Sequence, residues 1–276
     1  MQRVSKNMPM ELTSDYCEHK TYVAGHEVVK RIPMIRYDGV LQCPRCESEN
    51  LTKTMEDEES VRANAALHNE KYIILQKQSL LKDLTLLDAT LKNFQVSEGS
   101  EEETNKKRAV TAVQQYRSGE TFNTLLVGNP GAGKSHLAMS IIRNMNETDN
   151  KQRSCLFIDL DEMLSRVRDS FSNRESPYTE QYFIRLLSDV DYLVLDDLGA
   201  ETGSTNSGKT ASDYTMRILK GIADSRQSKS TIFTTNLDRA GLERMYDAKT
   251  VSRLLRDTYL IKFEKSTDKR IKNIEF

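Results

Sequence analysis

The chain has 276 residues, with 40 Lys and Arg against 41 Asp and Glu, a net charge of −1, and a hydrophobic fraction of 37%. These values describe one large domain, or one medium domain with a small appendage, and exclude collagen-like, disordered and membrane-embedded classes. No run approaches the roughly 18 apolar residues that span a bilayer, and the first residues lack the apolar core of a signal peptide. We therefore predict a cytoplasmic protein with no membrane partner.

Two acidic blocks, Glu56–Glu59 and Ser97–Glu103, punctuate the chain. Blocks of like charge are typical of solvated linkers and loops. We therefore predict three parts: a small N-terminal domain over residues 1–54, a helical linker over 55–83 and an α/β domain over 84–276.

The predicted elements follow in chain order. Alternating residues around Gly25 and Gly39 indicate small hairpins, and helical spacing predicts a connecting helix over Ser60–Gln78. From Leu84 onward strands alternate with helices, which predicts a parallel sheet covered on both faces. The strands are expected at 124–127, 154–159, 192–196, 230–235 and 259–263, and the helices at 105–118, 134–146, 161–171, 179–188 and 211–225, with two short helices before the last strand.

Residues 128–135 read GNPGAGKS, a full match to the P-loop pattern, between an apolar strand and a helix. Glycines let the backbone turn so that N–H groups and the helix N-terminus point at phosphate. Lys134 is expected to reach the β and γ oxygens of ATP, and the Ser135 hydroxyl to ligate Mg²⁺. The predicted nucleotide contacts are Gly128, Asn129, Pro130, Gly131, Ala132, Gly133, Lys134, Ser135 and His136, together with Asp196.

The strand at 192–196 delivers Asp196 and Asp197 to the carboxyl edge of the sheet. A P-loop enzyme has its second Mg²⁺ ligand at this place, so we assign Asp196 to the metal and Asp197 to the attacking water. Glu201 is an alternative to Asp197. The strand at 230–235 ends at Asn236, whose amide can hold water against the γ-phosphate.

Arg253 and Arg256 lie just before the last strand. An arginine supplied by a neighbouring subunit can stabilise charge on the transferring phosphoryl group. Arg253 is our candidate for that role and Arg256 the alternative. A solvated helix face is the simpler interpretation of both.

The N-terminal part contains a C-x-H pair, Cys17 and His19, and a C-x-x-C pair, Cys43 and Cys46. Two short ligand pairs separated by a hairpin predict a zinc ribbon with tetrahedral S and N ligands. His26 is an alternative to His19. A redox C-x-x-C motif would need a βαβ context that this part lacks.

The segments GNPGAGKS, YLVLDDLGAE, TIFTTNL and SRLLRD, in this order, resemble the AAA+ ATPases of bacterial and phage replicative helicase loaders of the DnaC/DnaI type, over residues 84–276. The resemblance implies a sheet of order 5-1-4-3-2 and a filament or ring in which one subunit's arginine touches the next subunit's ATP. It also implies that Leu86–Phe94 packs near the adenine, although Leu91 and Phe94 could simply be core anchors. Only 13 residues follow Phe263, too few for the helical lid of ordinary AAA+ enzymes.

By this resemblance we expect a slow, DNA-stimulated ATPase that uses ATP, Mg²⁺ and Zn²⁺, binds a hexameric replicative helicase through its zinc domain, and delivers it onto single-stranded DNA. The alternatives are a transposase-helper ATPase and a nucleotide-binding adaptor with little hydrolysis. Charges on helices are usually only solvated, so no DNA site is assigned. The candidate cations are Arg166, Arg168, Arg174, Arg185, Lys209, Lys220, Arg226 and Lys229.

Overall fold

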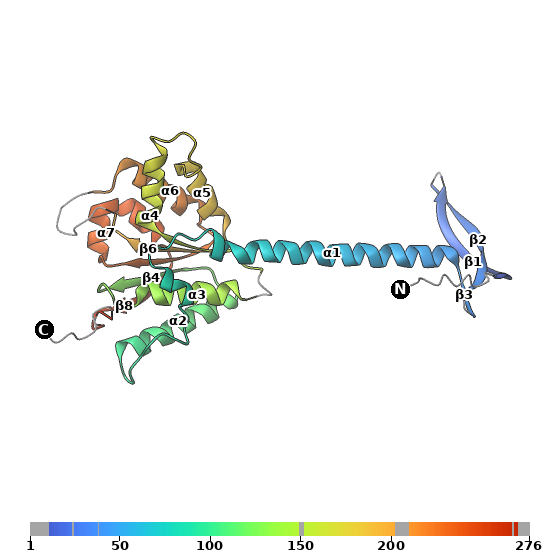
Figure 1. Ribbon diagram of the computed structural model, residues 1–276, viewed down its shortest axis with the longest axis horizontal. Helices are drawn as coiled ribbons and strands as arrows, with labels where there is room; N and C mark the ends of the chain where they lie inside the picture. The colour runs from blue at the N-terminus through green and yellow to red at the C-terminus, as the bar shows by residue number, and fades with distance from the viewer. Residues whose placement is uncertain are drawn as a thin grey trace, which may run out of the picture. The chain divides into compact units, whose positions relative to one another are not determined.

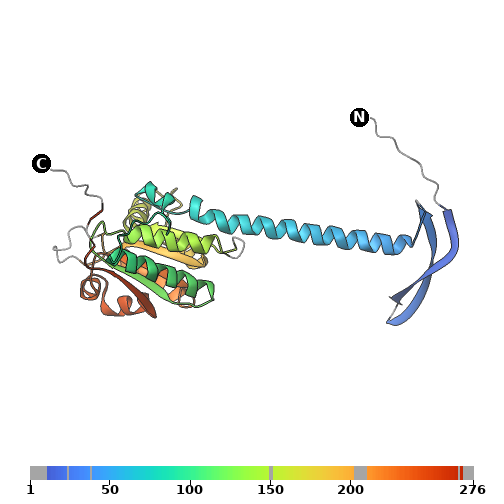
Figure 2. The same cartoon turned by 90° about the horizontal axis from the view of Figure 1, so that it is seen from below.

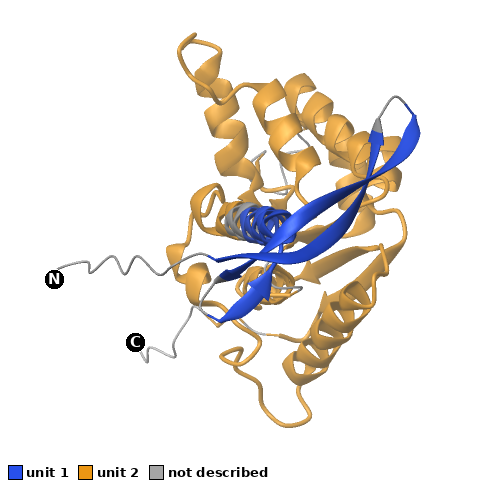
Figure 3. Cartoon of the chain, turned by 90° about the vertical axis from the view of Figure 1, so that its right-hand side faces the viewer, with its two compact units in different colours: residues 1–66 blue, residues 67–276 orange. Residues whose placement is uncertain are grey.

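The computed structural model describes residues 11–23, 25–37, 39–148, 152–201, 210–266 and 268–269. The chain divides into two compact units, Met1–Ala66 and Leu67–Phe276, which Figure 3 colours separately. The boundary falls within helix α1 (Pro44–Lys77). The three predicted parts do not coincide with this division, and their limits stay predictions.

The first unit contains a three-stranded antiparallel sheet of order β1-β2-β3, made of β1 (Glu11–Val23), β2 (His26–Tyr37) and β3 (Val40–Gln42). Its turns contain Gly25 and Gly39, whose φ angles of 84° and 77° favour glycine. Helix α1 then begins at Pro44, because the fixed φ of proline suits a first helical position.

Helix α1 is longer than the predicted helix over Ser60–Gln78 and takes in the acidic block Glu56–Glu59. The block is therefore helical, as expected of the helical linker predicted to begin at residue 55, and does not form a loop. Glutamate is a good helix former, and the side chains of this block are exposed to solvent, so its charge does not oppose helix formation strongly.

The second unit is built on a five-stranded sheet of order β5-β6-β7-β4-β8, in which every pairing is parallel. Numbered by occurrence within this unit, the order is 5-1-4-3-2, which confirms the predicted AAA+ arrangement. The strands are β4 (Asn123–Gly128), β5 (Cys155–Asp159), β6 (Tyr192–Leu198), β7 (Ser230–Thr235) and β8 (Thr258–Phe263).

Helices cover both faces of this sheet (Figures 1 and 2). One hydrophobic cluster joins the sheet to α2 (Glu101–Arg117) and α3 (Lys134–Asn146). The other lies on the opposite face, under α4 (Leu160–Ser170), α5 (Glu180–Asp189), α6 (Asp213–Ser225), α7 (Arg239–Tyr246) and α8 (Ala248–Leu254). The central strands are therefore buried along their length, which explains their continuous apolar runs.

Helix α2 begins four residues earlier than predicted, inside the acidic block Ser97–Glu103. The Ser100 hydroxyl accepts a hydrogen bond from Glu103 N at 3.1 Å, which makes Ser100 the N-cap. Acidic residues in a first turn also interact favourably with the helix dipole. Glu101–Glu103 of the block therefore belong to a helix, whereas residues 97–100 precede it.

The segment that joins α1 to the sheet lies along the outer edge of β5. Leu80 forms a parallel bridge with Ile158, donating from its N–H to Phe157 O at 2.9 Å and accepting from Asp159 N at 2.8 Å. The Ser79 hydroxyl accepts from Phe157 N at 3.0 Å. A 3₁₀ turn, η1 (Leu84–Asp88), follows.

Candidate nucleotide and metal sites

The P-loop connects β4 to α3 at the carboxyl edge of the sheet. Gly128 has a φ of 139°, and a Cβ atom there would lie 2.0 Å from the carbonyl oxygen of Phe263 at the end of β8. Only glycine satisfies both conditions. The first residue of the loop is therefore fixed by the last strand of the sheet.

The Lys134 ammonium is buried and donates to the carbonyl oxygens of Gly128 and Asn129 at 2.8 and 2.7 Å. It also donates to the Asn236 side-chain oxygen at 2.7 Å, although the two residues lie 102 positions apart. The structure thus brings together the P-loop lysine and the amide that follows β7. Asn236 thus lies at the carboxyl edge of the sheet, where the sequence analysis placed it, and its contact with Lys134 was not predicted.

Asp196 and Asp197 share one partner, Thr234 on the neighbouring strand. The Thr234 hydroxyl donates to Asp196 Oδ1 at 2.5 Å and accepts from the backbone N–H of Asp197 at 2.9 Å. Burial raises the pKa of the Asp196 carboxyl to about 7, against the hydrogen bonds from Thr234 and Ser135. Asp197 has a φ of 56°, a left-handed conformation that costs energy for a residue with a side chain.

A third carboxylate, Asp159, lies opposite Asp196 in the register of β5 and β6. Oxygen atoms of Asp159, Asp196 and Asp197 all lie within 4.8 Å of one another. Carboxylate and hydroxyl oxygens are the ligands that Mg²⁺ prefers, and Ser135 supplies the hydroxyl. The residues present therefore fit a magnesium ion bound together with a nucleotide.

Glu201, the alternative to Asp197, is bonded elsewhere. Its carboxylate accepts from the Tyr246 hydroxyl and from Gly199 N, and burial raises its pKa. It does not line the cavity beside the P-loop, whereas Asp197 does. The geometry favours Asp197 for contact with the nucleotide.

A cavity of about 350 Å³ lies against the P-loop, with Lys134, Asp197 and Asn236 in its wall. Phe94 lines the same cavity and is also buried in the core. His136 Nε2 lies 3.1 Å from Thr90 O and 3.0 Å from Asn93 Oδ1, and its ring is tilted against Phe94. Burial lowers the pKa of His136, which favours the neutral imidazole.

One residue that follows β8, Lys269, lines the same cavity. Glu101 of α2 accepts hydrogen bonds from three consecutive backbone N–H groups, Glu264 to Ser266, and from the Ser266 hydroxyl. Further along, Lys269 N donates to Gly131 O at 3.1 Å, and its ammonium lies 4.5 Å from the centre of the Phe94 ring. Lys269 thus places a second cation beside the P-loop.

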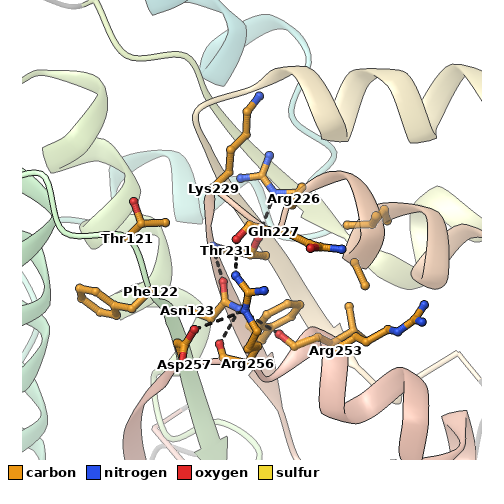
Figure 4. A pocket seen from close by; sticks show the side chains of 14 residues that line it. Thr121, Phe122, Asn123, Arg226, Gln227, Lys229, Thr231, Arg253, Arg256 and Asp257 are labelled. Carbon is orange, nitrogen blue, oxygen red and sulfur yellow. Dashed lines mark hydrogen bonds and ion pairs between the residues drawn. The ribbon is translucent and has the colours of Figure 1, made fainter.

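Arg253 and Arg256 lie away from this cavity. They line a different one, of about 130 Å³, together with residues at the amino ends of the strands, including Asn123 and Thr231 (Figure 4). Arg253 forms an ion pair with Asp224 at 2.8 Å, and Arg256 one with Asp257 at 3.3 Å. Because the sheet is parallel, both arginines occupy the edge opposite their own P-loop.

In the first unit the structure brings Cys17, His19, Cys43 and Cys46 together, with all four ligand atoms within 4.8 Å. Cys17 Sγ lies 3.8 Å from Cys46 Sγ, and His19 Nε2 lies 3.2 and 3.6 Å from the sulfurs of Cys43 and Cys46. A tetrahedral zinc ion would require about 3.8 Å between sulfurs and about 3.6 Å between sulfur and nitrogen. The cluster could therefore hold zinc.

The arrangement of this cluster follows from its elements. Cys17 and His19 alternate along β1, Cys43 precedes α1 and Cys46 lies in the first turn of α1. Hydrogen bonds from the backbone of Cys46 lower the pKa of Cys43 to about 7, whereas hydrogen bonding with Cys17 raises that of Cys46 to about 11. His26 pairs with Val23 at the hairpin turn and lies outside the cluster.

Among the candidate DNA cations, Arg226 is the clearest correction. Its guanidinium is buried and donates to the carbonyl oxygens of Leu187, Val190, Asp191 and Ser230. Its N–H groups therefore satisfy backbone carbonyls where α5 ends and β7 begins, and the side chain is not available to DNA. Lys209 lies outside the described residues.

Residues 100–238, just over half of the chain, match the model of the family "Type III restriction enzyme, res subunit". The matched range runs from the N-cap of α2 past the end of β7 and contains the P-loop, Asp196, Asp197 and Asn236. The chain belongs to this family. The match covers the nucleotide-binding part of the second unit, whereas the relatives described next extend over more of the chain.

The chain is similar to the "Replicative helicase loader DnaC" of Buchnera aphidicola subsp. Schizaphis graminum, with 25% identity over 83% of this chain and 89% of the relative. The DnaC protein of Escherichia coli K12 is 29% identical over 53% of this chain and 56% of its own length. These relatives confirm the resemblance to the helicase-loader family.

Two solved structures share the fold. The "DnaC helicase loader" has a TM-score of 0.51 and 22% identity, covering 66% of this chain and all of that one. The DnaI structure also has a TM-score of 0.51, with 19% identity over 67% of this chain and 95% of that one. In the part of the chain that the structure describes, no helix is long and apolar enough to cross a membrane.

Sequence reasoning missed four residues at or beside the candidate nucleotide site. They are Thr234, Asp159, Glu101 and Lys269. Thr234 and Asp159 each lie at or near the carboxyl end of a strand, so strand position alone could have suggested them. Glu101 and Lys269 carried no such signal, because their roles depend on where the segment after β8 crosses the P-loop.

Proposed function

We propose that this protein is an ATP-dependent loader that binds a hexameric replicative helicase and delivers it onto single-stranded DNA. The observation that carries the proposal is that a complete P-loop site lies in a chain whose similarity to DnaC loaders extends over 83% of its length. The same relatives favour this proposal over a transposase helper.

The proposed nucleotide chemistry follows from the edge of the sheet. Backbone N–H groups of the P-loop, residues 128–135 with the exception of Pro130, hold the phosphates, and His136 follows in α3. Lys134 neutralises the β and γ oxygens. Ser135 and Asp196 are proposed to hold Mg²⁺, which when bound would offset the charge of the phosphates. Asp197 and Asn236 orient water toward the γ-phosphorus, so that the phosphoryl group passes to water and ADP leaves.

Arg253 is proposed to act on the nucleotide of a neighbouring copy. It lies at the edge opposite its own P-loop, so it can complete a site only across an interface. Its ion pair with Asp224 must open for this contact, and both side chains are exposed enough for exchange with solvent to be rapid. Self-assembly through the ATPase part is therefore a component of the proposal.

The zinc cluster is proposed to hold residues 1–54 in the form that contacts the helicase. A three-stranded sheet of this size buries little, and several of its large apolar side chains are exposed, among them Leu12, Tyr16 and Tyr22. A bound metal would supply the missing folding free energy. The exposed apolar side chains would then be available to a protein partner.

The test combines the chain with its host's replicative helicase and single-stranded DNA circles. We expect a stable complex with the hexamer, ATP hydrolysis stimulated by single-stranded DNA, and transfer of the helicase to the circles. Lys134→Ala should abolish nucleotide binding and transfer but retain the complex, whereas Lys265→Ala, an exposed lysine after β8, should behave as the wild type.

Failure to bind the helicase would refute the loader proposal. Binding and transfer without any hydrolysis would instead identify a nucleotide-dependent adaptor.

A further inference from the structure

The edge segment Ser79–Lys82 lies between the end of α1 and the nucleotide site. Leu80 is bridged to β5 by two backbone hydrogen bonds, and its side chain is buried in the core on the face of α4 to α8. This fixes the backbone two residues before Lys82. The position of the Lys82 side chain is therefore set by the sheet rather than by a loose loop.

Lys82 forms two ion pairs. Its ammonium lies 3.2 Å from Asp159 Oδ1 and 2.6 Å from Asp161 Oδ2. The two partners differ in burial: the Asp159 side chain is 6% exposed and that of Asp161 is 40% exposed. A lost counterion matters far more for the buried carboxylate, because water cannot replace it.

Asp159 also contacts α4 and the other carboxylates of the site. Its Oδ1 accepts from Glu162 N at 2.8 Å and so caps α4. It also belongs to the carboxylate group with Asp196 and Asp197, the residues proposed to meet Mg²⁺ and water. Three carboxylates within 4.8 Å repel one another, and Lys82 is the cation that contacts this group from the edge of the sheet.

We infer that Lys82 is a positioning residue of the magnesium site: it offsets the charge of Asp159, so that the triphosphate meets only the two carboxylates that serve it. This inference rests on the proposed nucleotide site. Without Lys82, an uncompensated carboxylate would lie beside Asp196 and repel the γ-phosphate. ADP, which ends at the β-phosphate, would be affected less.

The test measures equilibrium binding of AMPPNP and of ADP, each with Mg²⁺, by calorimetry at low salt. Lys82→Met removes the charge but keeps the length, and we expect AMPPNP affinity to fall about fivefold, a modest value because Lys82 is half exposed and screened. ADP affinity should change less than twofold. The double variant Lys82→Met with Asp159→Asn should recover AMPPNP affinity, because no unpaired charge remains.

Asp161→Asn is the matched control, since it removes the other partner of Lys82 and leaves the buried pair intact. It should bind both nucleotides as the wild type does. Equal AMPPNP affinity in Lys82→Met and wild type, a double variant no better than Lys82→Met, or weakened binding in Asp161→Asn would each overturn the inference. A wild-type chain that bound no nucleotide would instead refute the proposed function itself.

Discussion

Asp196 and Asp197 are adjacent in sequence but occupy different environments. Asp196 stays in the ladder of β6 and is buried, whereas Asp197 turns out of it with a φ of 56° and lines the cavity. The ladder between β6 and β7 is irregular between Leu195 and Leu198, where this turn occurs. One carboxylate is therefore buried beside Thr234 and Asp159, and the other lines the cavity.

This difference separates Asp197 from Glu201 experimentally. Asp197→Asn should retain nucleotide binding and reduce hydrolysis at least tenfold, because the water loses its orienting carboxylate. Glu201→Gln should retain most of the hydrolysis and instead lower the melting temperature, because the buried bonds to Tyr246 and Gly199 change. Single-turnover hydrolysis and thermal unfolding measure the two effects. The reverse pattern would make Glu201 the catalytic residue.

The raised pKa of Asp196 makes a prediction about pH. A carboxyl with a pKa of about 7 is mostly protonated at pH 6 and mostly ionised at pH 8, and Mg²⁺ competes with the proton. We expect the Mg²⁺ concentration for half-maximal AMPPNP binding to fall about tenfold from pH 6 to pH 8. In Asp196→Asn the part of this pH dependence that comes from Asp196 should disappear. Only the part that comes from titration of the nucleotide should remain. A wild-type response no steeper than that of the variant would contradict the assignment.

At the scale of elements, β1 and the chain around the start of α1 bring the four cysteine and histidine side chains together. The purified chain should contain about one zinc ion, and His19→Ala should lose it while His26→Ala keeps it, because only His19 lies in the cluster. His19→Ala should also lose helicase binding and retain nucleotide binding. Metal analysis measures the zinc content, and calorimetry measures the binding of helicase and of nucleotide. A zinc-free wild type, purified under reducing conditions, would contradict this prediction.

The elements of the second unit were largely predictable from sequence. The helix over 134–146 and the strand over 230–235 coincide with α3 and β7, because buried parallel strands and amphipathic helices have distinct patterns. Glu101–Glu103 were predicted to lie outside the helix that follows, since charge alone does not distinguish a loop from an exposed helix. Ser100, three residues before Glu103, was the available signal of a helix start.

Residues of the site that belong to a sequence motif were predictable. Residues that reach the site because of how the strands are arranged were not. Lys134, Asp196 and Asn236 follow from their places at strand ends. Lys82 and Lys269 reach the same edge from distant parts of the chain, and no local pattern encodes the register that brings them there. The placement of Arg253 opposite its own P-loop required the parallel topology.

At the scale of the whole molecule, the proposed reaction needs residues from two copies of the chain, because they lie at opposite edges of the sheet. Lys134 lies at one edge and Arg253 at the other, so neither Lys134→Ala nor Arg253→Ala chains alone should hydrolyse ATP efficiently. Mixed together they should regain DNA-stimulated hydrolysis, because an intact pocket can meet an intact arginine. Arg253→Ala alone should bind ATP normally as a monomer.

The control for mixing is the double variant Lys134→Ala with Arg253→Ala. Added to either single variant, it should not raise ATP hydrolysis. Mixed oligomers that form but stay inactive would place Arg253 in a structural role.

The position of β4 between β7 and β8 has a consequence for the protein during its synthesis. Both neighbours of β4 are made later, and Gly128 is held by Phe263, 135 residues further along the chain. At ordinary translation rates the P-loop would wait on the order of 10 s for its last neighbour. Until then the nascent chain has the nucleotide motif without the nucleotide site, so a ribosome-bound chain stalled before β8 should not retain ATP.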